Sequence, residues 1–124
     1  MRINTEYRKG IMFLRLSGTL NKRTAVSLED KVNELVIDDE LTNIVINLNN
    51  IKKIDMKGIS TLYHIYETIK KYKGNTLICI NENEELKKIL KKERILNYIS
   101  DIDSELTAFN LIRIWGIIWQ MKWY

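Results

Sequence analysis

The stretch from Asn43 to Tyr63 constrains the fold more strongly than any other part of the chain. It opens with a mostly apolar and β-branched run at residues 44–48, which is typical of a strand covered on both faces. Asn49 and Asn50 interrupt this run, and we expect a loop there because Asn is common in turns. Asp55 precedes a segment of helical period and predicts an N-cap, since a carboxylate can accept a hydrogen bond from a free N–H of the first helical turn.

This order of strand, loop and capped helix is the repeating unit of α/β proteins. In such proteins ligands and partners dock at the carboxyl ends of the strands, where the loops lead into the helices. We therefore place the candidate site at Asp55, Met56, Lys57 and Gly58.

Two short runs of β-forming residues open the chain. They occupy residues 2–7 and 11–16 and flank a turn at Arg8-Lys9-Gly10, which indicates a hairpin. In the second run Met12, Leu14 and Leu16 alternate with Phe13, so two apolar faces are expected. Residues 17–21 are expected to form a loop.

The rest of the chain alternates between stretches of helical spacing and strand-like runs. The order β-β-α-β-α-β-α-(β)-α predicts an α/β fold with a mixed, mainly parallel sheet of four to five strands and about four helices. The helices are expected at residues 25–36, at 57–72 with Gly74 as a left-handed cap, at 84–92, and after Ser104 with a stripe of Leu106, Phe109, Leu111 and Ile112; the later strands are expected at 76–80 and, as an edge strand, at 95–99.

Length and composition indicate one globular domain. The chain has 124 residues, 45% of them hydrophobic, which is enough for a core without disulfides or a metal. Cys79 is the only cysteine and residues 1–10 lack the apolar core of a signal peptide, so we expect a cytoplasmic protein without an internal disulfide. The net charge of +4 comes with no nucleic-acid-binding motif, and we assign it to a lysine-rich surface.

No pattern of catalytic residues stands out, and we predict that the chain is not an enzyme and uses no cofactor. It contains no glycine-rich phosphate loop, metal-ligand spacing or nucleophile elbow. The acidic run at residues 38–40 would need further ligands to hold a metal, and we interpret it as a solvated loop. His64 is expected on the surface, whereas Cys79 lies in an apolar run and is expected to be a small buried residue.

Three groups of residues carry a resemblance to a known family. They are Gly18-Thr19-Leu20-Asn21 with Thr24-Ala25, then Asn43-Ile44-Val45-Ile46-Asn47-Leu48, and then Ile54-Asp55-x-x-Gly58-Ile59. In this order they resemble the STAS domain, and more narrowly the bacterial anti-sigma factor antagonists. The resemblance runs from about Ile3 to Leu111 and implies the STAS fold for residues 1–113.

The resemblance implies a regulatory function. Proteins of this family bind a serine kinase of ATPase fold that is also an anti-sigma factor, and so release the sigma factor. The kinase switches them off by phosphorylating a Ser or Thr directly after the Asp of the motif. A phosphate there would lie at a helix N-terminus, where free N–H groups and the helix dipole favour it.

This chain departs from the family at the decisive position. Met56 follows Asp55, and Lys57 comes next, so the usual acceptor hydroxyl is absent. Ser60 and Thr61 are the nearest surrogates, but one turn into a helix we expect them to face neighbours or bond the backbone. We therefore predict a partner-binding module that is not phosphorylated at the usual place and is always active or regulated elsewhere.

The resemblance also places the partner-binding surface. It should combine the residues Asn21, Lys22, Arg23 and Thr24, the loop from Asp55 to Gly58, and the exposed side of the following helix, including His64. The expected partner is an anti-sigma factor and serine kinase. The alternative is a STAS adaptor that docks on a transport ATPase or a larger signalling scaffold.

Residues 114–124 form an apolar tail beyond the resemblance and hold all three tryptophans of the chain. The tail is too short to span a bilayer, which takes about 20 residues. We expect it to fold back on the domain or to pack between the subunits of a homodimer. Contact with a partner or a membrane surface is the alternative, because Arg113 and Lys122 flank a tryptophan-rich core; a segment read out of frame is the third.

Overall fold

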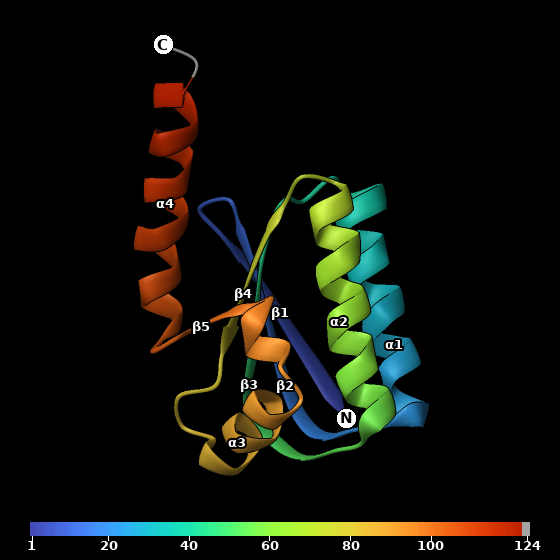
Figure 1. Ribbon diagram of the computed structural model, residues 1–124. Helices are drawn as coiled ribbons and strands as arrows, with labels where there is room; N and C mark the ends of the chain where they lie inside the picture. The colour runs from blue at the N-terminus through green and yellow to red at the C-terminus, as the bar shows by residue number, and fades with distance from the viewer. Residues whose placement is uncertain (123–124) are drawn as a thin grey trace.

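The computed structural model describes the backbone of residues 1–122 and the side chains of residues 1–114. A single sheet of five strands in chain order lies at its centre (Figure 1). β1 is antiparallel to β2, and each later strand is parallel to the one before it. The strands are β1 (Arg2–Arg8), β2 (Ile11–Leu20), β3 (Asn43–Ile54), β4 (Asn75–Cys79) and β5 (Ser100–Ile102).

Helices connect the parallel strands and extend the chain after the last of them. This arrangement confirms the predicted α/β fold with a mixed, mainly parallel sheet and four helices. The helical elements are α1 (Lys22–Asn33), the π-helical turn η1 (Glu34–Asp38), α2 (Met56–Lys71), α3 (Glu84–Lys92), the 3-10 turn η2 (Ile95–Asn97) and α4 (Glu105–Lys122).

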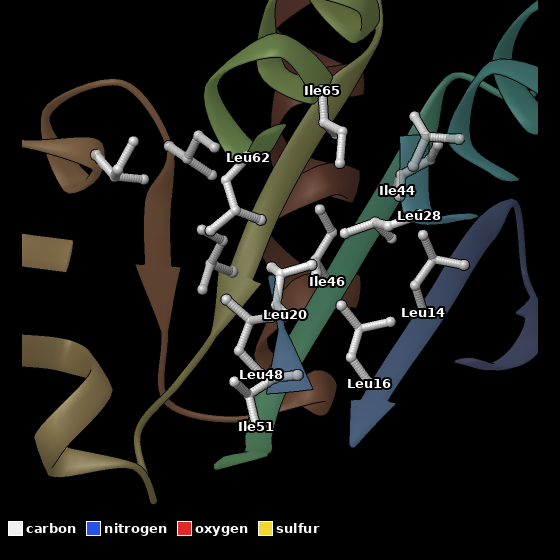
Figure 2. Close-up of a cluster of buried hydrophobic side chains, with 14 of the residues drawn as sticks. Leu14, Leu16, Leu20, Leu28, Ile44, Ile46, Leu48, Ile51, Leu62 and Ile65 are labelled. Carbon is white, nitrogen blue, oxygen red and sulfur yellow. The ribbon is translucent and has the colours of Figure 1, made fainter. Parts of the chain in front are cut away.

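The two faces of the sheet are covered by different helices. α1, α2 and α3 pack on one face, and the first turns of α4 pack on the other (Figure 1). The central strand β3 is buried on both sides, since Ile44 and Ile46 join the larger cluster while Val45 joins the cluster under α4. Figure 2 shows the larger cluster, in which Leu28 of α1 and Leu62 of α2 lie against the apolar side chains of β2 and β3. The expectation of a strand covered on both faces is confirmed.

Two expected loops are strand instead. β3 continues through Asn49 and Asn50 to Ile54, and β2 continues to Leu20. The two strands pair in parallel to their ends, with two register shifts that absorb extra residues of β3. Pairing with a neighbouring strand therefore overrides the preference of Asn and Gly for turns, and the irregularity appears as bulges.

The expected edge strand lies a few residues further along the chain. Residues 95–97 form η2, and the strand that pairs with β4 is β5. Ile95 and Ile99 are buried in the larger cluster, so their apolar character reflects packing against helices and not a place in the sheet.

Two details of the helix ends also differ from expectation. Lys73, with φ 62°, takes the left-handed conformation after α2 that we expected of Gly74. Gly74 is required for another reason, because a Cβ there would collide with the carbonyl oxygen of Thr42. In α4 the side chain of Leu106 is 72% exposed, and Ala108 takes the buried position on the sheet.

Candidate functional site

The N-termini of α1 and α2 lie side by side at one end of the sheet. β2 ends at Leu20 and β3 ends at Ile54, and these two residues are register partners in neighbouring parallel strands. Asn21 and Asp55 follow directly as the N-caps of α1 and α2. In Figure 1 this end of the molecule is the lower one, opposite the C-terminal end of α4. The carboxyl ends of two strands thus bring both predicted segments together.

Asp55 serves both helices with one carboxylate. Its Oδ1 accepts a hydrogen bond from the backbone N–H of Gly58 at 2.8 Å, which caps α2 as predicted. Its Oδ2 accepts from the backbone N–H of Lys22 at 3.1 Å, in the first turn of α1. Its own backbone N–H donates to the carbonyl of Leu20 at 3.2 Å. Negative charge at a helix N-terminus is favourable, so Asp55 joins the two helix starts.

Asn21 and Thr24 build the start of α1. The Asn21 side-chain oxygen accepts from the backbone N–H groups of Arg23 and Thr24, and Thr24 Oγ1 accepts from the Asn21 N–H at 2.9 Å. The same hydroxyl lies 2.7 Å from the carbonyl oxygen of Thr19, to which it donates. This reciprocal capping box uses both polar side chains for structure. Their partner-binding role stays a prediction.

Gly58 allows the close approach of α2 to the end of β2. It is buried, and a Cβ at this position would lie 2.5 Å from the carbonyl oxygen of Leu20 and 2.8 Å from Cγ1 of Ile54. Any side chain would force the helix start away from the strand. The glycine of the motif is therefore needed for packing, whatever else binds there.

Met56 and Lys57 project from the first turn of α2. Met56 is 63% exposed, so its side chain does not pack into the core. Thr61 is fully buried and Ser60 is half-buried, so the nearest hydroxyl groups are less accessible than the Met56 side chain. The exposed group at the helix start is a thioether, which is apolar and adaptable.

Positive charge surrounds this helix start. We call residues 21–24 and 52–58 the cationic face, because it exposes five basic side chains: Lys22, Arg23, Lys52, Lys53 and Lys57. In the part of the chain whose side chains the structure describes, none of the five forms an ion pair. Its one acidic residue, Asp55, already accepts two backbone hydrogen bonds. The face therefore presents a net positive surface around Met56.

Lys52, Lys53 and Asn83 were not among the predicted site residues. We expected a loop at Asn49 and Asn50 and did not assign the two lysines that follow to the site, although a basic pair directly before the motif was the available signal. The Asn83 side-chain amide donates to the Ile51 carbonyl at 2.8 Å and to the Leu48 carbonyl at 3.2 Å, which holds the end of β3. It also lines a hollow of about 210 Å³ beside Lys53 and Ile54.

His64 lies apart from the cationic face. Two turns of α2 separate it from Met56, or about 12 Å at 1.5 Å per residue. It is half-exposed as expected, and its Nδ1 lies 3.9 Å from Oε1 of Glu29 in α1. Its predicted place in the partner surface would require a partner that extends along α2.

The remaining polar candidates offer no catalytic arrangement in the described residues. Cys79 is buried, and burial raises the pKa of its thiol above the ordinary range, which disfavours the reactive thiolate. No three His, Cys, Asp or Glu side chains among residues 1–114 lie together as possible metal ligands. Within the same described part, no helix has the length and apolar character to cross a membrane.

Comparisons with known proteins agree with this architecture. The STAS domain family matches residues 2–108 of the chain. An anti-sigma F factor antagonist of Paenibacillus polymyxa is 22% identical over 114 residues, which cover 92% of this chain and 97% of that protein. A candidate anti-sigma factor antagonist of Thermotoga maritima has a crystal structure with a TM-score of 0.82 at 16% identity, covering 90% of this chain and 94% of its own.

A further solved structure is similar along almost its whole length. The anti-sigma factor antagonist SpoIIAA in its unphosphorylated form gives a TM-score of 0.71 at 17% identity, covering 90% of this chain and 98% of its own. The SpoIIAA of Bacillus has also been solved in a phosphorylated form. At these identities the superpositions establish a shared fold.

Proposed function

The chain belongs to the STAS domain family, and we propose that it acts as an anti-sigma factor antagonist that binds its kinase partner without being phosphorylated at the usual position. The proposal extends the likeness to the Paenibacillus antagonist and to SpoIIAA, which cover nearly all of the described domain. It is a binding function, so it requires a stable, exposed surface and no bond made or broken on the chain itself.

The exposed thioether of Met56 is the observation that carries this proposal. Met56 directly follows the helix-capping Asp55 and so occupies the position at which the family accepts a phosphoryl group. Its side chain has no oxygen to accept one. Lys57 adds a cation in the first turn, next to the positive end of the helix dipole. Thr61 is buried and Ser60 lies within α2, so neither replaces the missing hydroxyl at the helix start.

The cationic face determines what kind of partner fits. Five exposed cations around one exposed methionine complement an acidic surface that contains an apolar pocket. Opposite charges across an interface raise the association rate, whereas a central apolar side chain that becomes fully buried contributes most to affinity. We therefore assign steering to the lysines and Arg23, and anchoring to Met56.

The adaptor alternative has less support. A partner for a transport ATPase or a signalling scaffold would use the same fold, but no residue of the cationic face favours it over an anti-sigma factor. A kinase-capture experiment separates the two functions, because an adaptor would not capture the kinase.

The test uses the ATPase-fold serine kinases of the same cell. Purified protein should capture one of them, and with labelled ATP the wild-type chain should take up no label near Met56. The variant Met56→Ser restores the acceptor hydroxyl and should become labelled by the captured kinase. Stoichiometric label on a residue near Met56 in the wild-type chain would refute the proposal, as would capture of none of these kinases.

Charge variants test the assigned face. Lys53→Glu combined with Lys57→Glu should weaken capture of the kinase and should make that capture much less dependent on salt concentration. The matched control is Lys91→Glu with Lys92→Glu on α3, which makes the same change in net charge on exposed residues outside the cationic face. Equal weakening by both pairs would mean that net charge, and not this face, determines binding.

A further inference from the structure

α4 extends beyond the domain on which it begins. Its first turns pack on the sheet, where Ala108 is buried and Phe109 lies 5.4 Å from Phe13, measured between ring centroids. Leu106 and Ile114 are exposed, at 72% and 50%. Figure 1 shows that the helix then continues past the β1–β2 turn, and that no other element accompanies its C-terminal part. The sheet therefore supports only the beginning of this helix.

The sequence of the extending part is almost entirely apolar. Between Ile114 and Met121 the only polar side chain is that of Gln120. The three tryptophans, Trp115, Trp119 and Trp123, recur at intervals of four residues. A helix of such composition is stable in a protein when something apolar covers it. Because no other element accompanies the backbone of this part of the helix, we look for the cover outside the domain (Figure 1).

The charges along α4 indicate what that surface is. From Leu106 to Tyr124 the chain has two basic residues, Arg113 and Lys122, and no acidic residue. A groove of about 460 Å³ beside the helix is lined by Arg8, Lys9 and Arg113 together with Asn110 and apolar side chains. Tryptophan is enriched at membrane–water interfaces, and anionic lipids attract basic residues that lie beside a bilayer.

The same charges disfavour a second copy of the chain as the cover. Pairing two α4 helices would combine Arg113 and Lys122 of both copies, with no acidic residue of α4 beyond Glu105 to compensate their charge. Glu6, on the neighbouring strand, already pairs with Arg8 and Arg15. An anionic lipid surface supplies the missing counter-charge and the apolar environment together.

We propose that α4 seats this protein on an anionic lipid surface, with its C-terminal part lying in the interface. The proposal is independent of the proposed function and compatible with it. The cationic face lies at the opposite end of the molecule from the C-terminal end of α4, so a protein seated in this way directs that face away from the bilayer (Figure 1).

Tryptophan fluorescence of the full chain tests the proposal directly, because all three tryptophans lie in residues 115–123. Vesicles of phosphatidylglycerol mixed with phosphatidylcholine should shift the emission to shorter wavelength and carry the protein into the pellet on sedimentation. Vesicles of phosphatidylcholine alone should do both much more weakly. No shift and no co-sedimentation with the anionic vesicles would overturn the proposal.

Charge variants assign the contact to α4. Arg113→Gln should weaken vesicle binding about five-fold, and Arg113→Gln with Lys122→Gln about 25-fold, since each cation near an anionic surface contributes about 1 kcal/mol. The control, Lys91→Gln with Lys92→Gln on α3, removes the same charge and should leave binding unchanged. Equal weakening by the control pair would overturn the assignment to α4.

Two results without lipid would also overturn the proposal. Emission that shifts with protein concentration, together with a dimer in sedimentation velocity, would assign the tail to a second copy. Short-wavelength emission from a monomer would show that the tail is covered by its own domain.

Discussion

Two regions lie at opposite ends of the molecule and differ in how firmly the core holds them (Figure 1). One is formed by the carboxyl ends of β2 and β3, and the other is the far part of α4. At the first, two helix starts are joined by the carboxylate of Asp55 and packed closely through Gly58. At the second, a single helix leaves the sheet after its first turns. The helix starts are therefore fixed by contacts from two strands and two helices, whereas the far part of α4 is attached to the domain only through its first turns.

Among the substitutions considered, a leucine-to-alanine change in the core under α2 should have the largest effect on stability, and the same change under α4 a much smaller one. Leu62 of α2 is fully buried in the larger cluster, whereas Leu111 of α4 is half-buried. We expect Leu62→Ala to lower the free energy of unfolding by about 3–4 kcal/mol and Leu111→Ala by about 1 kcal/mol. Urea unfolding followed by circular dichroism measures both. Equal losses would mean that α4 is packed on the sheet as strongly as α2.

Removing the Asp55 carboxylate, which accepts hydrogen bonds from both helix starts, should have the next largest effect on stability. Asp55→Ala removes an acceptor from the first turns of both α1 and α2, and should cost about 2 kcal/mol of unfolding free energy. Ser104→Ala, the matched change at the start of α4, should cost about 0.5 kcal/mol, because its one backbone contact, from Thr107 N–H, is long at 3.4 Å. A loss for Asp55→Ala no larger than that for Ser104→Ala would show that Asp55 does not join the two helices energetically.

The attachment of α4 should depend on pH. Hydrogen bonds from Arg15, and in second place from Asn47, hold the pKa of Glu105 below its ordinary value of 4.5. A lowered carboxyl pKa stabilises the fold above the unfolded-state pKa, and this contribution is lost as the pH falls through the folded-state pKa.

Glu105→Gln measures that contribution. We expect it to cost about 1 kcal/mol at pH 7, a modest value because Arg15 is partly solvated and keeps Glu6 as a second partner. The difference from the wild-type chain should shrink as the pH falls from the unfolded-state pKa of about 4.5 through the lower folded-state pKa, because the wild-type carboxylate then becomes protonated and loses its charge. A difference that stays constant from pH 7 to pH 3 would mean that the charge of Glu105 does not stabilise α4.

Substitution of Met56 should have the smallest effect on stability. Because its side chain is 63% exposed, Met56→Ala should change the free energy of unfolding by less than about 0.5 kcal/mol. The same variant should weaken capture of the kinase measurably, since a central apolar contact is lost. Unfolding curves and capture assays on one preparation separate the two effects. A large stability loss would place Met56 in the core and remove the argument for an exposed anchor.

Local patterns in the sequence were sufficient for much of the fold. The helical stripe of Ile59, Leu62, Ile65 or Tyr66, and Ile69 predicts α2; Ile65 is the buried member of the alternative pair, and the other three are buried as well. Asp55 predicts the start of that helix, because capping depends on groups within one turn of each other. The STAS resemblance rests on the same local motifs and agrees with the family match over residues 2–108.

Features that depend on residues far apart in the chain appear only in the tertiary structure. β3 runs through Asn49 and Asn50 because β2 pairs with it, and that pairing places Lys53 opposite Thr19 and Ile54 opposite Leu20, directly before the start of α1. The second hydrogen bond of Asp55 joins residues 33 positions apart, which no local pattern contains. Periodicity and capping are short-range properties that a sequence displays directly, whereas strand ends, shared caps and the charge of a face arise only when separate segments meet.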